Sequence, residues 1–238
     1  MVTSHPYFFQ GINFKKLLRI AFSLGLVAAL INSLADMNTH RSQSLDWLEM
    51  LQNLSLYTSC CLLGLVFAEK TPMESFLFRR GTSWPRKGLS LLCFGLIPGG
   101  VMGITYHRLF APYRFSSRVP VRIRAIENHY DTFLLSLRAG VTEELVFRFL
   151  LLTAFFYILK RMFRPLIEQG IGMTRWIPLL FSLLLSSLLF GVVHGSYGFM
   201  IAFLAGIGLG IAYLRGGLES AILAHFLADF FFFNMTYL

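Results

Sequence analysis

Two adjacent glutamates and an arginine interrupt an apolar stretch of the chain, in the order Glu143-Glu144-Leu-Val-Phe-Arg148. An ionisable side chain at the centre of a bilayer costs roughly 2.5–3.5 kcal/mol on insertion scales, so such groups pair, line a polar site or take part in chemistry. On a helix, Glu144 and Arg148 lie four residues apart with the acid first, the favourable order for an ion pair. Glu143 points about 100° away from Glu144. We therefore expect Glu143 to face a polar site, where a carboxylate can act as a general base.

Two more polar groups follow on later apolar runs. His194 ends one run, with Phe190 one helical turn before it, and in isolation a histidine at a helix end is as well explained by a place at the membrane surface. His225 and Asp229 share a helix face in the last run, where the carboxylate could fix the tautomer of the imidazole. Together with the first cluster they predict one shared polar site, which could activate water, bind a metal or relay protons.

The elements that carry these residues are expected to be membrane helices. Hydrophobic residues make up 55% of the 238 residues and charged residues only 14%, with a mean hydropathy of +0.63. Soluble domains carry about a quarter charged residues. We predict an all-α polytopic membrane protein, a bundle of about seven helices (six to eight) with a polar catalytic cavity in its C-terminal half. The expected runs are Leu17–Ala35, Leu51–Ala68, Gly88–Tyr106, Phe133–Leu159, Trp176–His194, Tyr197–Leu214 and Leu218–Tyr237.

We expect a single integral membrane domain over 1–238, with N-terminal helices and basic loops in 1–130 and a motif-bearing core in 131–238. Pro98-Gly99-Gly100 should kink or interrupt the third run, and the fourth could break near Gly140. Ala202, Gly206 and Gly210 fall on one face and predict close helix packing.

The net charge of +9 comes from Lys and Arg between the apolar runs, which is typical of loops that face anionic lipid rather than nucleic acid. The loops favour a cytoplasmic N-terminus, with Asp36 in the first loop. The basic segment from Arg108 to Arg124 conflicts with this topology, so either it lies along the membrane surface or the helix count is off by one. The three cysteines form no CxxC pair and predict neither a zinc knuckle nor a redox motif.

The ordered motifs resemble those of the CPBP family, the intramembrane proteases related to the CAAX prenyl endopeptidase Rce1 and also called the Abi family. The matching segments are Glu143-Glu144-Leu-Val-Phe-Arg148, Phe190-Gly-Val-Val-His194 and His225-Phe-Leu-Ala-Asp229, and the resemblance covers roughly 135–232. Two positions depart from the family pattern. Phe149 stands where members often have Gly, and Asp229 stands where the eukaryotic-type enzymes have Asn.

The resemblance implies hydrolysis of a peptide bond inside the membrane, without a cofactor. Glu143 would activate water, His194 would hold that water, and Glu144 and Arg148 would brace the site, with Phe190 in support. His225 and residue 229 would stabilise the oxyanion. Because an ionised aspartate cannot donate a hydrogen bond, we assign Asp229 as an orienter of His225.

Other functions stay open at this point. Glu143, His194, His225 and Asp229 could bind Zn²⁺ in a membrane metalloprotease, although no His-Glu-x-x-His element is present. The same cluster could serve a proton-coupled transporter or a non-catalytic bacteriocin-immunity or scaffold protein, but no inverted repeat supports transport. We expect a membrane-associated peptide or protein as substrate, with or without a lipid group. The other expected partner is the lipid bilayer, and no nucleic acid is expected. Short loops are typical of prokaryotic members, which predicts the prokaryotic plasma (inner) membrane.

Overall fold

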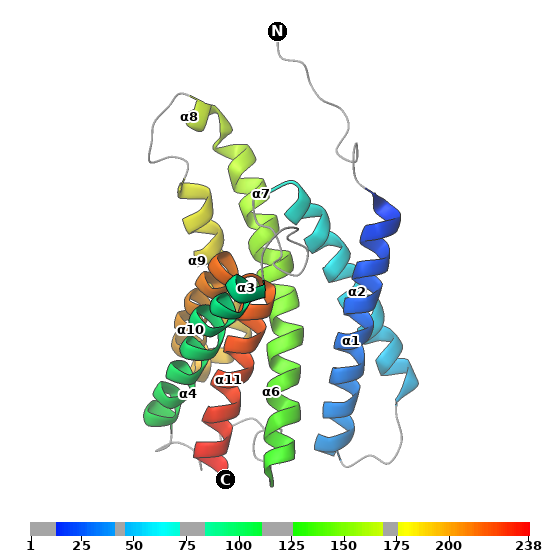
Figure 1. Cartoon of the computed structure of the whole chain (residues 1–238), viewed down its shortest axis with the longest axis vertical. Coiled ribbons are helices and arrows are strands. Elements are labelled where there is room, and N and C mark those ends of the chain that lie inside the picture. Colours follow the sequence, from blue (N-terminus) through cyan, green and yellow to red (C-terminus); the bar gives the residue numbers. More distant parts are fainter. Residues whose placement is uncertain (1–12, 41–45, 72–83, 111–125, 169–175) are drawn as a thin grey trace.

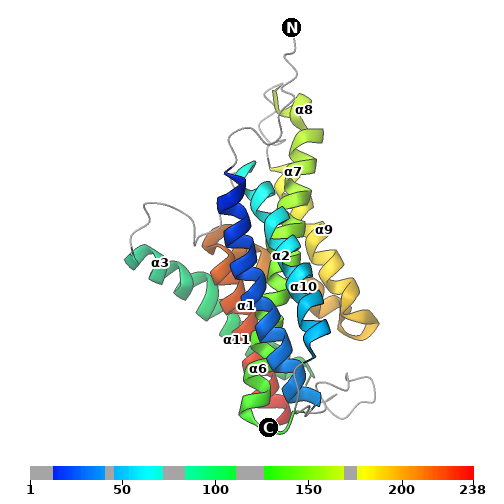
Figure 2. The same cartoon turned by 90° about the vertical axis from the view of Figure 1, so that its right-hand side faces the viewer.

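The computed structural model describes residues 13–40, 46–71, 84–110, 126–168 and 176–238, and within these ranges it is helical without strands (Figures 1 and 2). The elements are α1 (Phe14–His40), α2 (Trp47–Glu69), α3 (Trp84–Leu91), η2 (Leu92–Leu96), α4 (Ile97–Phe110), α6 (His129–Glu144), η4 (Leu145–Leu152), α7 (Thr153–Met162), α8 (Arg164–Glu168), α9 (Ile177–Val193), α10 (Gly195–Gly216) and α11 (Leu218–Tyr237). The two η elements are π-helical and join their neighbours into continuous helices.

The described residues form seven long helical segments, one for each predicted apolar run. Five of them are long and apolar enough to cross a membrane: α1, α2, the helix from α3 to α4, α10 and α11. The helix from α6 to α7 is longer still but carries the charged cluster, and α9 is apolar but has only 17 residues. The prediction of an all-α polytopic membrane protein is therefore confirmed.

The helix from α6 through η4 to α7 is the central element of the bundle. Figure 1 shows α6 between α1 on one side and α11 on the other, and α1 and α2 pack together against it. Helix α4 packs on α11, and α9 and α10 pack as a pair against the central helix and α11. Helices α9, α10 and α11 thus surround the predicted polar residues together with the central helix.

The packing contacts fix the direction of each helix. Asp36 of α1 pairs with Arg138 of α6, and Asn38 lies further along α1 beside Asp131, so α1 and α6 are antiparallel. Helix α11 is also antiparallel to α6, because its C-terminal Asn234 donates to Thr132 near the start of α6. Successive helices therefore alternate in direction.

The alternating helix directions can be compared with the predicted membrane topology. The basic residues at the start of α1 and the end of α7 lie at one end of the bundle, the end that the charge bias predicts to be cytoplasmic. Helix α4 ends at the opposite end, with Arg108 in its last turn. Within the described residues the number of helical segments agrees with the predicted seven. The basic segment from Arg108 to Arg124 lies mostly in residues 111–125, outside the described ranges, so both explanations of it stay predictions.

Small residues let the helices approach closely. A Cβ added at Gly99 would lie 2.6 Å from the Ala224 carbonyl oxygen, and one at Gly103 would lie 2.7 Å from that of Ala228. Membrane helices associate largely through such small-residue contacts, because lipid tails are as apolar as the side chains. Helix α4 thereby rests directly on the backbone of α11.

The predicted small-residue face of α10 also packs as expected. Ala202 is buried, a Cβ at Gly206 would lie 2.9 Å from the Ser187 Cβ, and one at Gly210 would clash with the Leu183 side chain. Both contacts are with α9. This face is what holds α9 and α10 together as a tight antiparallel pair.

The two expected helix breaks take another form. The helix through Pro98 continues, and the π-helical turn η2 ends two residues before the proline, where a wider turn gives room to a ring that has no N–H to donate. The helix also continues through Gly140, whose missing side chain admits the backbone of α11, with the Ile222 carbonyl oxygen 3.0 Å from an added Cβ. The change in the fourth helix comes later, at Leu145, where η4 begins.

Candidate active site

Glu144 and Arg148 lie at the centre of the bundle and are completely buried. Arg148 Nε is 3.3 Å from Glu144 Oε2, the contact that their spacing predicts. None of the three guanidinium nitrogens has a hydrogen-bond partner among the described residues, so the contact is an ion pair without a well-directed hydrogen bond. A buried charge of this kind needs a partner nearby, and Glu144 is the carboxylate that supplies it.

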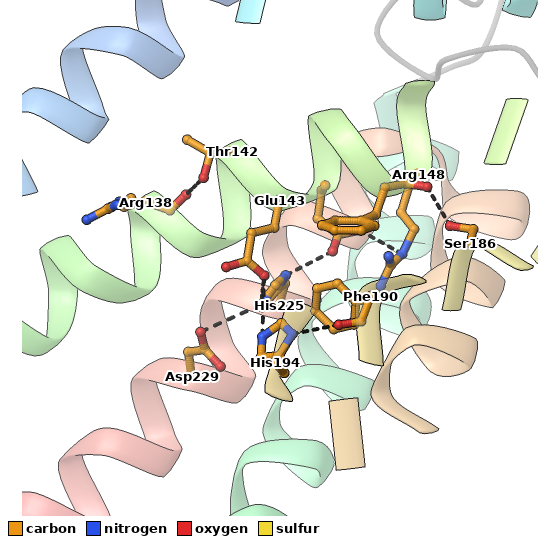
Figure 3. Close-up of polar contacts among 11 residues, drawn as sticks. Arg138, Thr142, Glu143, Arg148, Ser186, Phe190, His194, His225 and Asp229 are labelled. Atoms are coloured by element: carbon orange, nitrogen blue, oxygen red, sulfur yellow. Dashed lines mark hydrogen bonds and ion pairs between the residues drawn. The ribbon is translucent and has the colours of Figure 1, made fainter. Parts of the chain in front are cut away.

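Glu143 faces another direction, as helical geometry predicts (Figure 3). Its Oε2 atom lies 3.8 Å from Nε2 of His194 and 3.9 Å from Nε2 of His225. These distances are too long for direct hydrogen bonds. The carboxylate therefore stands opposite two imidazole nitrogens, one from the end of α9 and one from α11.

His225 is held by Glu144. Its Nδ1 lies 2.9 Å from Glu144 Oε1, and because a carboxylate only accepts, Nδ1–H is the donor. Its Nε2 lies 3.6 Å from Asp229 Oδ2, beyond hydrogen-bond distance. The carboxylate that accepts the hydrogen bond of the His225 ring is therefore that of Glu144, on another helix. From the sequence we had assigned the orienting role to Asp229, on the same helix as His225.

His194 is held by its own helix. Its Nδ1 lies 2.7 Å from the Phe190 carbonyl oxygen, so Nδ1–H donates and Nε2 is directed to Glu143. Helix α9 ends at Val193, and Gly195 starts α10 with a φ of 71° that favours glycine. This sharp turn brings the histidine back into the bundle.

The turn at His194 lies at the depth of the active-site residues. Glu143 is 14 residues into α6, and at the helical rise of 1.5 Å per residue it is about 21 Å from the start of that helix. His225 is seven residues after Leu218, about 10 Å from the start of α11. Since His194 lies within 4 Å of Glu143, α9 ends inside the bundle, which accounts for its short length.

Phe190 is the aromatic centre of the cluster. Its ring centroid is 4.5 Å from that of His194, 5.7 Å from that of His225 and 5.1 Å from that of Phe147. The guanidinium carbon of Arg148 lies 4.5 Å from the same centroid, within the range of a cation–π contact. Phe190 therefore packs against the guanidinium of Arg148 on one side and against both imidazole rings on the other.

The structure thus brings all the predicted site residues together. It also adds polar residues that the sequence did not indicate. Asp36 lies in α1 rather than in a loop, is buried, accepts from Asn32 at 2.8 Å and pairs with Arg138 at 2.7 Å. Arg138 comes five residues before Glu143, and its carbonyl accepts from Thr142 at 2.8 Å. The Asn32–Asp36 spacing of four is the one sequence signal that could have indicated a helical pair.

Comparison with known protein families gives a match in the C-terminal half of the chain. Residues 126–231 match the family model described as Type II CAAX prenyl endopeptidase Rce1-like. The matched range begins just before α6 and ends within α11, so it contains every predicted site residue. No curated protein and no solved structure matches the chain.

Proposed function

Because the chain belongs, through residues 126–231, to the Rce1-like family of CPBP proteases, we propose that it is an intramembrane glutamic endopeptidase. The family makes it a membrane protease of the CAAX type in general, and the proposal adds the mechanism. The observation that carries the mechanism is the position of Glu143 Oε2, 3.8 Å and 3.9 Å from two imidazole nitrogens. A single water can bridge polar atoms that are separated by such distances.

Glu143 acts as the general base in the first step. It takes a proton from the water as the water oxygen attacks the carbonyl carbon of the scissile peptide bond, and the carbonyl oxygen becomes an oxyanion. His194 holds the water: since its Nδ1–H donates to the Phe190 carbonyl, Nε2 of the neutral ring is the acceptor that faces Glu143. The backbone contact therefore fixes the tautomer that this role requires.

His225 stabilises the oxyanion through Nε2. Its Nδ1–H is already committed to Glu144, so Nε2 can donate only when the ring carries both protons. Glu144 at 2.9 Å and Asp229 at 3.6 Å supply the negative charge that such a ring requires beside it. Asp229 acts here as a counter-charge, and Arg148 keeps the second oxygen of Glu144 in place.

The second step breaks the C–N bond. As the tetrahedral intermediate collapses, the proton on Glu143 passes to the leaving nitrogen, so the products are a new carboxylate and a new amine, and Glu143 returns to its ionised form. No covalent enzyme intermediate is needed. The burial of Glu144, Arg148 and His225 keeps bulk water from these charges and strengthens their interactions.

The substrate is a membrane-associated peptide, lipidated in the manner of a CAAX protein or a prokaryotic equivalent. Glu143 and His194 are the site residues with the most exposed side chains, 31% and 36%, so the peptide approaches on their side. His225 lies about 10 Å along α11 from its first residue, Leu218, so the scissile bond lies within the bundle beside the middle of α6–α7. We place the protein in a prokaryotic plasma (inner) membrane, as its short loops predict.

The experiment is a cleavage assay with the purified protein in detergent micelles, using a lipidated peptide and a transmembrane peptide. Mass spectrometry of the products should find one new carboxyl terminus and one new amino terminus at a single bond. If folded protein cleaves neither peptide, the protease proposal is wrong. Proton flux in reconstituted vesicles would then identify a transporter, and its absence would favour a scaffold or immunity role.

Zinc-dependent hydrolysis by the same residues is the alternative. Glu143, His194, His225 and Asp229 present the oxygen and nitrogen donors that zinc binds, and their side-chain atoms face one another at 3.6–3.9 Å. Among the described residues, however, no three such side chains are close enough together to hold a metal ion. Activated water therefore fits this arrangement better, and a strong chelator distinguishes the two mechanisms.

A further inference from the structure

The catalytic helix changes its winding at the residue after Glu144. Residues Leu145–Leu152 form the π-helical segment η4, within a helix that is otherwise α-helical from His129 to Met162. In a π-helix each N–H bonds five residues back, the turn is wider, and such segments are rare and short. A π-helical segment is therefore maintained where contacts with surrounding residues stabilise it.

Two buried hydroxyls bond to carbonyls within this segment. Thr153, on the same helix, donates to the carbonyls of Phe149 and Leu150. Ser186 donates to the Phe147 carbonyl at 2.6 Å from another helix, α9. Ser186 is 1% exposed, so its hydroxyl has no access to bulk water and the bond to Phe147 is strongly favoured.

The carbonyl that Ser186 holds belongs to the residue before Arg148. Arg148 lies against Glu144 at 3.3 Å, and Glu144 in turn accepts from His225 at 2.9 Å. A rotation of the peptide after Phe147 would move the Arg148 side chain along the helix axis and away from Glu144. The Phe147 ring, in contact with Phe190, would move with it.

We infer that Ser186 is a positioning residue, whose hydroxyl holds the π-helical segment in the register that places Arg148 against Glu144 and, through Glu144, orients His225. Its effect on catalysis rests on the proposed protease function. The neighbouring buried serines of α9 differ in their contacts. Ser182 donates to Leu179 in its own helix, and Ser187 packs against Gly206 of α10.

Ser182 therefore provides the matched control, since it is a buried serine one turn earlier on the same helix face. In the peptide assay, Ser186→Ala should lower kcat about tenfold with KM nearly unchanged, the size expected from one lost hydrogen bond. Ser182→Ala should keep the wild-type kcat. Ser186→Thr keeps a hydroxyl and should recover most of the loss, whereas a merely structural role would leave kcat unchanged in all three variants.

A second measurement does not depend on activity. Amide hydrogen exchange of the peptide that covers 145–152 reports local opening of the segment, and Ser186→Ala should speed it severalfold while Ser182→Ala leaves it at the wild-type rate. Equal exchange and equal kcat in the two alanine variants would overturn the inference. If the wild type cleaves no peptide, the protease proposal is wrong, and the exchange rates alone then support or overturn the role of Ser186 in holding the segment.

Discussion

Glu144 holds His225 by a hydrogen bond of 2.9 Å to Nδ1, while Asp229, on the same helix as His225, stays 3.6 Å from Nε2. The carboxylate of Glu144 therefore serves two partners, because its other oxygen lies 3.3 Å from Arg148. The adjacent glutamates have separate roles: the buried one supports two side chains, and the partly exposed one faces the histidines.

Replacing Glu144 and replacing Asp229 should accordingly have unequal effects on stability and on activity. Glu144→Gln removes the charge that balances buried Arg148, and breaking such a pair costs about 3–5 kcal/mol. Activity should fall with it. Asp229→Asn removes the counter-charge near Nε2 but keeps the Glu144–His225 bond, so this variant should lower kcat by less than Glu144→Gln does. Thermal unfolding and the peptide assay measure both, and a larger loss in Asp229→Asn would mean that Asp229 orients the ring.

The ion pair of Asp36 with Arg138 should contribute to the free energy with which α1 packs on the catalytic helix. Asp36→Asn leaves a poorly exposed guanidinium without its charge partner, which should cost about 1–3 kcal/mol of stability. Reversing both charges together should recover part of that loss. Thermal unfolding in detergent checks this against Glu168→Gln, which breaks an exposed pair with Arg164 and should not change the melting temperature. Equal shifts in the two single variants would exclude a special role for Asp36.

The glycines of α4 provide a test of helix packing. Gly103→Ala places a Cβ 2.7 Å from the Ala228 carbonyl oxygen, and overpacking of this kind costs about 1–3 kcal/mol. Gly100→Ala is the control on the same helix, since its Cβ meets nothing closer than the Phe231 ring at 3.9 Å. It should be neutral or slightly stabilising, because Ala favours helix more than Gly does. The order of the two melting temperatures decides whether α4 rests on α11 as described.

Metal removal separates the two hydrolytic mechanisms. If Glu143 activates a water without a metal, cleavage should continue at the wild-type rate after prolonged treatment with a strong chelator. Loss of activity that added Zn²⁺ restores would instead identify Glu143, His194, His225 and Asp229 as ligands. Elemental analysis of the purified protein provides an independent check.

The sequence predicts the features of this molecule that are local. Seven apolar runs gave seven helical segments, and the spacing of Glu144 and Arg148 gave their contact. The order of the three motifs along the chain and the free-energy cost of burying ionisable side chains were enough to predict that the three polar clusters lie together. The contact of Asp36 with Arg138 was missed because the first helix was ended at Ala35, and because the side chain that balances the charge of Asp36 lies 102 residues further along the chain.

Other features depend on contacts between helices that no local pattern contains. The π-helical segment η4 receives a hydrogen bond from Ser186, 39 residues after Phe147. The second partner of Glu144 lies 81 residues away, so spacing alone assigned His225 to Asp229, its neighbour on the same helix. The sequence pattern predicts Glu144 and His225 as site residues but not Ser186, and the packing of separate helices decides which hydrogen bonds these residues form.

The central claim is that Glu143 activates the water that cleaves the peptide. Its most direct test is the rate of cleavage of a lipidated or transmembrane peptide by purified Glu143→Gln, with Glu168→Gln as the control for an acid outside the site. The account predicts that Glu143→Gln keeps the wild-type melting temperature and loses about 10²–10⁴ of the rate, the contribution of a general base. Cleavage by folded Glu143→Gln at the rate of the control would contradict it.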